Sequence, residues 1–284
     1  MKHVDLPDGT RVPALGLGTW KLGESKAAHK AEVAALRTAI ELGYRLFDTA
    51  EMYGEGGAER VLGEALRGAF AAGDVTRDEL FIVSKVYPHN ASRKGTAAAC
   101  ERSLARLGLD RIDLYLLHWP GAHPLAETVA AFDALRTQGR IAHWGVSNFD
   151  LAGMQDLQRV DEQGHCATNQ VWYSASQRGV EFDLLPWQRE HQMPLMAYSP
   201  IDQAALARHS VLEGIGKRLG ASAAQVALAW ALRDGRVMAI PKAVGEDHLR
   251  DNLAAADLAL NASALAAIER AFPPPTRKSA LAMI

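Results

Sequence analysis

The sequence predicts an α/β protein whose strands and helices alternate around a closed (β/α)8 barrel of the TIM type. Eight short apolar segments alternate with amphipathic helical stretches along the 284 residues, and such alternation is typical of a parallel sheet. Most of the apolar segments are nearly continuous, which indicates strands covered on both faces. Eight such units in a chain of this length favour a closed barrel over a doubly wound sheet.

The predicted strands follow a small N-terminal hairpin. Residues 3–12 alternate between apolar and polar around Asp8-Gly9, a dipeptide typical of hairpin turns. We expect the eight barrel strands at residues 14–20, 45–49, 80–85, 112–118, 143–147, 167–172, 194–199 and 237–241.

Helical stretches separate these strands. The first has Val33, Leu36 and Ile40 at roughly helical spacing and stops before Gly43, a residue suited to a helix C-terminus. Ser222 and Gln225 have the spacing of a capping box at the start of a later helix. We expect helices at residues 27–42, 58–70, 95–107, 126–138, 151–161, 179–191, 222–233 and 262–271, with 252–260 leading into the last.

A single domain is the simplest account of this pattern. The glycine-rich segment 16–23 (GLGTWKLG) lacks the spacing of a dinucleotide-binding fingerprint, which argues against a Rossmann sheet. We see no internal repeat, low-complexity segment or linker. We therefore expect residues 1–284 to form one barrel domain with an N-terminal hairpin and a short C-terminal tail.

Composition limits the partners. The formal net charge of −2 gives no electrostatic footprint for nucleic acid or an anionic membrane. The N-terminus lacks the apolar region of a signal peptide, and no apolar run approaches the ~20 residues that cross a bilayer. Cys100 and Cys166, far apart in sequence, fit a reducing compartment. We expect a soluble, cytoplasmic protein.

Polar residues collect at the predicted carboxyl ends of the strands, where barrel enzymes place their catalytic groups. They are Trp20, Asp48, Lys85, His118, Ser147, Asn148, Gln170, Ser199 and Lys242. Together with Tyr53, the residues Asp48, Lys85 and His118 suggest a site that delivers a proton. A lysine held by a carboxylate would favour the phenolate and so lower the tyrosine pKa. Taken singly, Asp48 could cap a helix and Lys85 could be a solvated strand end. His118 could be a core histidine, and Tyr53 could be a surface aromatic residue. Their occurrence in consecutive units favours one site.

The motifs GLGTW, DTAEMYG, IVSK, LHW, GVSN, NQ, AYSP and IPK occur in one order and spacing along the chain. In this the sequence resembles the aldo-keto reductases over essentially its whole length, and looks most similar to bacterial members that reduce small aldehydes such as methylglyoxal. The resemblance implies NADPH-dependent reduction of small aldehydes and ketones to alcohols, with NADH as an alternative cofactor.

The resemblance also implies roles for individual residues. Tyr53 would donate a proton to the carbonyl oxygen, Lys85 paired with Asp48 would lower the pKa of Tyr53, and His118 would orient the carbonyl. No metal is implied, and the chain has no metal-binding motif. The substrate would contact Trp20, Tyr53, His118 and Trp119. A short loop after His118 and a short tail predict an open, shallow site for small aldehydes.

Sixteen positions correspond to the family's cofactor contacts, and at one of them Asp251 replaces the family's glutamate. Ser147, Asn148 and Gln170 would hold the nicotinamide carboxamide, and Tyr198 would stack on its ring. The full set is Gly18, Thr19, Trp20, Ser147, Asn148, Gln170, Tyr198, Ser199, Pro200, Ile201, Gln203, Lys242, Ala243, His248, Asp251 and Asn252. His248 stands where the family has an arginine for the 2′-phosphate, and Arg250 is close enough to substitute.

Two other interpretations stay open on the sequence. One is a nicotinamide-binding regulatory subunit of the same superfamily, which would bind the cofactor without turnover. The other is an isomerase or aldolase with a Schiff base at Lys85, which Asp48 opposes by keeping the lysine protonated. A small-molecule carbonyl substrate and a monomeric state are our expectations. The physiological substrate does not follow from the sequence.

Overall fold

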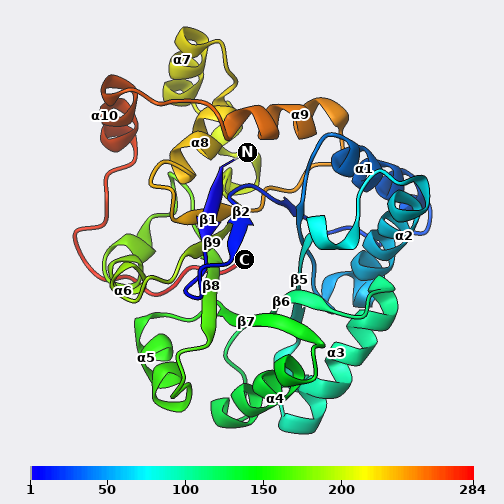
Figure 1. The fold of residues 1–284 in the computed structure, drawn as a ribbon. Helices are drawn as coiled ribbons and strands as arrows, with labels where there is room; N and C mark the ends of the chain where they lie inside the picture. Colours follow the sequence, from blue (N-terminus) through cyan, green and yellow to red (C-terminus); the bar gives the residue numbers. More distant parts are fainter. Residues whose placement is uncertain (1) are drawn as a thin grey trace.

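The computed structural model describes residues 2–284 and confirms the (β/α)8 barrel (Figure 1). Eight parallel strands pair in sequence order, each with the next along the chain. They are β3 (Leu17–Gly18), β4 (Leu46–Asp48), β5 (Phe81–Val86), β6 (Ile112–Leu117), β7 (Ile141–Ser147), β8 (Cys166–Trp172), β9 (Leu195–Tyr198) and β10 (Val237–Ala239). All eight predicted strands are therefore present.

The barrel closes where the first and last strands meet. Leu15, just before β3, forms a parallel bridge with Ala239 of β10. The Gly16 amide donates to the Ala239 carbonyl at 2.9 Å, and Gly18 follows at the end of β3. A Cβ at Gly18 would lie 2.9 Å from the Ile240 carbonyl oxygen. Only glycine fits this close approach without a shift of the backbone.

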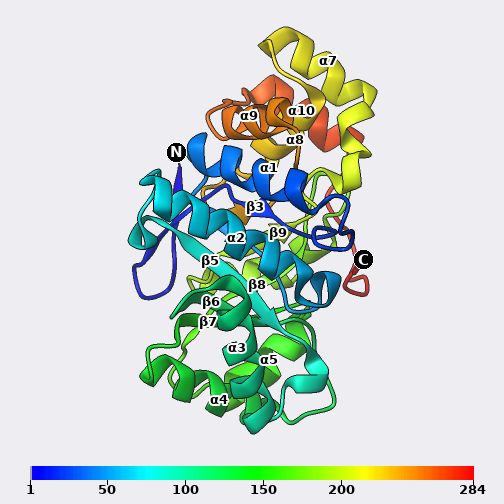
Figure 2. The same ribbon diagram turned by 90° about the vertical axis from the view of Figure 1, so that its right-hand side faces the viewer.

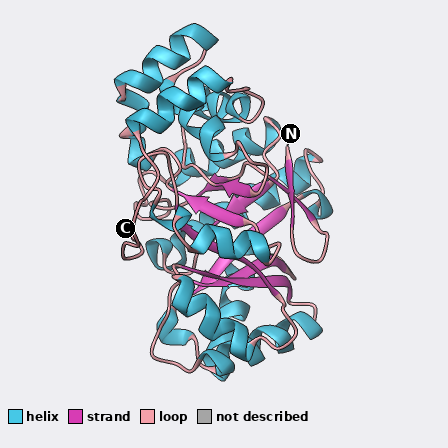
Figure 3. Cartoon of the chain, turned by 90° about the vertical axis from the view of Figure 1, so that its left-hand side faces the viewer, coloured by secondary structure: helices cyan, strands magenta, loops and turns pink. Residues whose placement is uncertain are grey.

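Ten α-helices are assigned in the described chain, and they surround the strands (Figure 3). They are α1 (His29–Glu41), α2 (Gly57–Ala72), α3 (Arg93–Leu107), α4 (Leu125–Thr137), α5 (Leu151–Val160), α6 (Leu184–Glu190), α7 (Ser210–Leu219), α8 (Ala223–Ala231), α9 (Glu246–Ala255) and α10 (Ala262–Ala271). The Ser222–Gln225 capping box at the start of α8 is confirmed.

Three helical expectations differ from the structure. Residues 252–260 were expected to lead into the last helix, whereas helix α9 spans Glu246–Ala255. The predicted helix at 179–191 is a short 3-10 turn (Gly179–Glu181) followed by α6, because Asp183 is not helical and Pro186 has no N–H to continue a helix through its first turn. Helix α7 was not predicted, although Leu212 and Ile215 form its buried face.

The predicted hairpin is confirmed and closes one end of the barrel. Strands β1 (His3–Asp5) and β2 (Arg11–Pro13) pair antiparallel and bury Val4 and Val12. Together with residues at the amino ends of β4 to β7, the hairpin lines a groove. Figure 1 shows it in front of the ring of helices, and Figure 2 shows the C-terminus on the opposite side. The carboxyl ends of the strands are left for the functional site.

Candidate functional site

A cavity of about 580 Å³ lies at the carboxyl ends of the barrel strands. Fifteen of the predicted site residues line it, and they come from seven of the eight strand ends. They are Gly18, Trp20, Asp48, Tyr53, His118, Trp119, Ser147, Asn148, Gln170, Tyr198, Ser199, Pro200, Ile201, Gln203 and Lys242. The sequence thus located most of the lining, as expected when strand ends meet at one face of a barrel.

Lys85 joins two of the catalytic candidates. Its ammonium donates to Asp48 Oδ1 at 2.6 Å, to the Thr49 carbonyl at 2.9 Å and to Tyr53 Oη at 3.2 Å. The side chains of Lys85 and Asp48 are 0% and 2% exposed. Such a deep ion pair needs nearly all its donors and acceptors satisfied, and here the lysine has three acceptors. These three hydrogen bonds hold the Lys85 ammonium next to the Tyr53 hydroxyl.

The protonation equilibria of this group are coupled. Burial raises the pKa of Tyr53 above 10.0, the Lys85 cation opposes that rise, and Asp48 adds to it. The Lys85 effect thus has the expected sign, but burial outweighs it, so the net pKa of Tyr53 is raised rather than lowered. Burial lowers the pKa of Lys85, but Asp48 and Tyr53 reverse this and leave it raised. Tyr53 therefore carries its proton at neutral pH.

His118 lies beside the phenol as a neutral ring. The ring centroids of His118 and Tyr53 are 5.6 Å apart with an edge-to-face geometry. Burial, followed by the Lys85 charge, holds the pKa of His118 well below 6.5. Its Nδ1 is buried and has no hydrogen-bond partner among residues 2–284. A neutral imidazole here can exchange a hydrogen bond with a substrate oxygen without adding charge.

The amide side chains in the wall serve the protein as well as the cavity. Gln170 Nε2 donates to Asp48 Oδ2 at 2.7 Å, so both carboxylate oxygens of Asp48 accept hydrogen bonds. Tyr198 Oη donates to Asn148 Oδ1 at 2.9 Å. Asn148 has a left-handed backbone (φ +59°), and its Nδ2 donates to the His118 carbonyl at 3.2 Å. The sequence did not indicate that Gln170 also holds the Asp48 carboxylate in place.

The loop after β9 has an unusual backbone. Ser199, Asp202, Gln203 and Ala204 all have φ between +47° and +73°. Consecutive left-handed residues cost conformational energy and concentrate at functional sites. Ser199, Gln203 and Ala204 also line the cavity, which places the strained segment at its wall.

Five predicted cofactor residues do not line the cavity. Thr19 is buried, and its hydroxyl donates to the Asp48 carbonyl at 3.0 Å. Ala243 is also buried, as is Asn252, whose side chain faces the Tyr44 phenol. His248 and Asp251 are exposed on α9.

Arg250, the suggested substitute for a phosphate-binding arginine, is engaged elsewhere. Its Nε and Nη2 donate to Glu246 Oε1, one turn back on α9, at 3.0 and 2.6 Å. This surface pair, together with the separate position of Lys242 in the cavity wall, leaves no assembled arginine site there.

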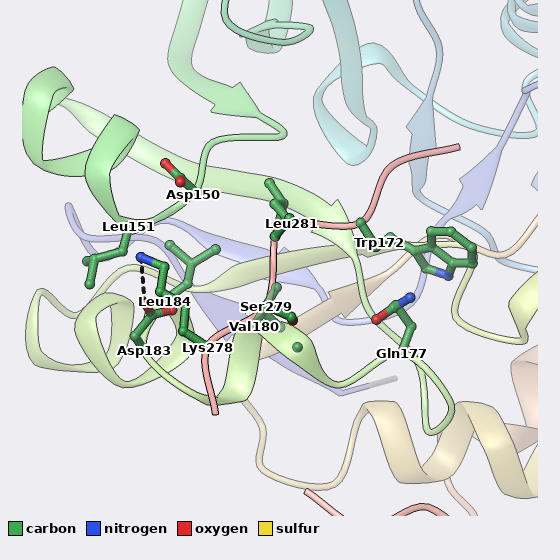
Figure 4. Close-up of a pocket in the computed structure, with 13 residues that line it drawn as sticks. Asp150, Leu151, Trp172, Gln177, Val180, Asp183, Leu184, Lys278, Ser279 and Leu281 are labelled. Atoms are coloured by element: carbon green, nitrogen blue, oxygen red, sulfur yellow. Dashed lines mark ion pairs between the residues drawn. The ribbon is translucent and has the colours of Figure 1, made fainter. Parts of the chain in front are cut away.

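The C-terminal tail adds residues that the sequence did not indicate. It leaves α10 near Phe272, whose carbonyl accepts from Arg178 Nη1 at 2.6 Å. Figure 4 shows it crossing residues from the loop before α6, with an ion pair between Lys278 and Asp183 at 3.0 Å. Its last residues, Met283 and Ile284, line the cavity. The site is therefore less open than the loop lengths indicated, since the tail supplies part of its wall.

Met52 and Lys21 are further lining residues missed by sequence reasoning. Both are next in sequence to predicted site residues, and this neighbourhood was the only signal available for them.

In the described part of the chain, no group of three or more His, Cys, Asp or Glu side chains could hold a metal ion. Every helix of residues 2–284 is too short or too polar to span a bilayer.

Comparisons with known proteins point to one family. The family model described as "Aldo/keto reductase family" matches residues 14–272. Methylglyoxal reductase YeaE of Escherichia coli (strain K12) is 48% identical, with 100% of this chain and 99% of that protein covered. Glyoxal reductase of Bacillus subtilis (strain 168) is 35% identical, with 88% of this chain and 85% of that protein covered.

A solved structure supports the same grouping. The aldo-keto reductase from Klebsiella pneumoniae in complex with NADPH is 47% identical and superimposes with a TM-score of 0.93. The match covers 100% of this chain and 99% of that one. The likeness therefore extends to the hairpin and the tail as well as the barrel.

Proposed function

The chain belongs to the aldo/keto reductase family, and we propose that it reduces small aldehydes and ketones to alcohols with NADPH. The observation that carries the proposal is the 3.2 Å contact between Lys85 Nζ and the Tyr53 phenol in the cavity wall. The similar proteins named methylglyoxal and glyoxal reductase, and the NADPH in the Klebsiella structure, support the same assignment.

The chemistry of the cavity wall fits a nicotinamide dinucleotide. Ser147 and Asn148 offer donors and acceptors for a carboxamide, and Tyr198 offers an aromatic face. Lys242 offers a cation for a phosphate. When bound, NADPH supplies the hydride that goes to the carbonyl carbon. We assign the other cofactor contacts to Gly18, Thr19, Trp20, Gln170, Ser199, Pro200, Ile201, Gln203, Ala243, His248, Asp251 and Asn252.

Tyr53 is the proposed proton donor. Its phenol keeps its proton at neutral pH because burial raises its pKa. As negative charge develops on the carbonyl oxygen, Tyr53 Oη gives up that proton, and the Lys85 cation at 3.2 Å stabilises the phenolate left behind. A placed acid of this kind contributes about 10²- to 10⁴-fold in rate. In alcohol oxidation the same phenolate takes the proton back.

His118 and the apolar walls position the substrate in this proposal. A hydrogen bond from the neutral imidazole fixes the carbonyl oxygen beside the phenol. Trp20, Trp119 and Met283 supply apolar surface in the cavity wall. A cavity of about 580 Å³ shared with a nicotinamide leaves room for small aldehydes, so methylglyoxal and aromatic aldehydes such as 4-nitrobenzaldehyde are the proposed substrates.

The test of this function is NADPH oxidation with methylglyoxal and 4-nitrobenzaldehyde. Tyr53→Phe should lose about 10²-fold or more in kcat while it keeps NADPH affinity. Tyr115→Phe is the matched control, because the Tyr115 side chain is fully buried and lies outside the cavity wall. Cofactor binding without turnover of any small aldehyde would instead favour a regulatory subunit. Full activity of Tyr53→Phe would disprove the proton-donor role.

His248 provides the test of cofactor preference. We propose that it lies at the 2′-phosphate, where an imidazole lacks the planar, bidentate fork with which a guanidinium holds phosphate. His248→Arg should then tighten NADPH binding relative to NADH, as measured by quenching of protein fluorescence. An unchanged ratio of the two dissociation constants would place His248 away from the phosphate.

Organisation and location complete the proposal. We treat residues 1–284 as one domain acting as a monomer in the cytoplasm, without a nucleic-acid or membrane partner. Of the five exposed large apolar side chains in the described chain, Met52, Met283 and Ile284 line the cavity, and the other two, Phe182 and Val244, come from separate segments. Cys100 and Cys166 are buried free thiols, as expected in a reducing compartment. Light scattering on a size-exclusion column tests the monomer.

A further inference from the structure

Glu51 lies between Asp48 and Tyr53, but its side chain does not line the cavity. The carboxylate is 8% exposed. Its Oε1 accepts from the Tyr87 amide at 2.8 Å and from Asn90 Nδ2 at 2.9 Å. Glu51 thereby ties the loop that carries the proton donor to the segment that follows β5.

Two arginines of α3 reach the same loop from outside the barrel. Arg102 Nη2 lies 3.3 Å from Glu51 Oε2, and Arg106 Nη2 lies 3.9 Å from it. Arg106 Nε also donates to Glu59 Oε2 at 2.5 Å, and the Glu59 carboxylate is fully buried. The other Glu59 oxygen accepts from Ser84 Oγ at 2.6 Å. This arginine–carboxylate network connects α2, α3 and β5, the strand that carries Lys85. Figure 2 labels these three elements.

The turn enclosed by this network is strained. Gly54, Glu55 and Gly56 directly follow Tyr53 and have φ of +55°, +51° and +79°. A side chain such as that of Glu55 rarely adopts this conformation unless its surroundings impose it. Arg106 packs against the turn so closely that a Cβ at Gly56 would lie 2.6 Å from its Cδ and Nε.

Residues on both sides of Tyr53 are thus held from outside the cavity. Glu51 stands two residues before it, and Glu59 stands in the first turn of α2, which follows the strained turn. The backbone amide of Glu51 also approaches the Lys85 carbonyl at 3.4 Å. The loop is therefore anchored to the strand whose lysine the phenol must meet.

We propose that Glu51, bound by Arg102 and Arg106, is a positioning residue that fixes the loop between Asp48 and Tyr53 and so keeps the phenol against Lys85. This inference rests on the proposed reduction, in which that contact stabilises the phenolate. It assigns to α3 a part in catalysis although no residue of α3 lines the cavity.

Two variants of Glu51 test the proposal. Glu51→Gln keeps an acceptor for the two neutral donors but removes the charge that the arginines bind, and Glu51→Ala removes every contact. Neither variant leaves a buried cation unpaired, because Arg106 still pairs with Glu59 and the Arg102 side chain is half exposed. We expect kcat for methylglyoxal to fall about tenfold in Glu51→Ala and less in Glu51→Gln, with the NADPH dissociation constant unchanged. Glu101→Gln is the matched control on the same helix, since it breaks the exposed Arg140–Glu101 pair away from the loop.

A pH profile separates positioning from a merely structural role. Four titratable groups interact with the Tyr53 phenol or ring: Lys85, Asp48, His118 and Tyr198. If the phenol drifts from Lys85, its phenolate loses stabilisation, so the alkaline limb of the kcat profile moves to higher pH. A fall in kcat with an unmoved limb would make Glu51 a structural residue only. Wild-type kcat and profile in Glu51→Ala would also overturn the proposal.

A readout without turnover keeps this test separate from the proposed function. The ultraviolet absorbance of the Tyr53 phenolate can be titrated as the difference between each protein and its Tyr53→Phe counterpart. We expect the Glu51→Ala titration to shift to higher pH even if no aldehyde is reduced. An unshifted titration would refute the positioning role, whereas absent turnover in wild type would refute only the reductase proposal.

Discussion

Replacement of Asp48 by asparagine should leave a buried cation without its counterion. Lys85 and Asp48 are 0% and 2% exposed and 2.6 Å apart, and breaking such a pair costs about 3–5 kcal/mol. The Thr49 carbonyl and the Tyr53 hydroxyl still accept from Lys85, so we expect the lower end of that range. Urea unfolding at pH 7, followed by circular dichroism, measures the loss.

The same variant should gain a pH dependence that the wild type lacks. In wild type the pKa of Lys85 is raised, so its stabilising contribution is fully present below the unfolded value of about 10.4. In Asp48→Asn, burial without a carboxylate lowers that pKa, so the unfolded state binds more protons over the window below about 10.4. Stability should therefore fall as the pH drops from 10 toward the new pKa.

Two further variants serve as controls for the effect of Asp48→Asn on stability. Asp156→Asn breaks the exposed pair with Arg159 and should change stability by less than about 1 kcal/mol. Asp48→Asn combined with Lys85→Met removes both buried charges and should recover much of the loss without recovering activity. Wild-type stability of Asp48→Asn, with no new pH dependence, would refute the account of Lys85 as a buried cation held by Asp48.

Three more predictions use other parts of the structure. Because the pKa of His118 lies well below 6.5, the pH profile of kcat should show no inflection near pH 6.5. An inflection there that disappears in His118→Asn would contradict a neutral ring. Cys100, whose thiol pKa burial raises to about 12, should resist a disulfide reagent in native protein, as should Cys166, and both should react in guanidinium; fast native labelling would contradict their burial. Gly18→Ala should lower the urea midpoint, because its Cβ would approach the Ile240 carbonyl to 2.9 Å; an unchanged midpoint would show that the backbone there yields freely.

The strand pattern was readable from the sequence because barrel strands are buried on both faces. Their apolar runs leave a clear signal even where a strand is as short as β10. The boundaries of α6 were not readable, since the apolar spacing of 179–191 continues across Asp183, where the helix breaks. Secondary structure thus followed local pattern except where backbone geometry overrode it.

The site was readable to the extent that strand ends carry it. Asp48, Lys85 and His118 end three apolar runs, and their meeting follows from the barrel alone. The ties from Glu51 to α3 could not be inferred, because they depend on which face of a loop turns outward. Met283 lies in a tail with no periodic pattern, and only its packing brings it to the cavity.

The seam between Leu15 and Ala239 has a consequence for the life of the chain on the ribosome. The first strand's edge finds its partner only when the last strand emerges, so most of the sheet must exist first as an open, incomplete ring. Open strand edges invite pairing with other chains, and contacts between distant segments form slowly. Synthesis that stalls before β10 should therefore release chains that aggregate, even though seven of the eight barrel strands have already been made.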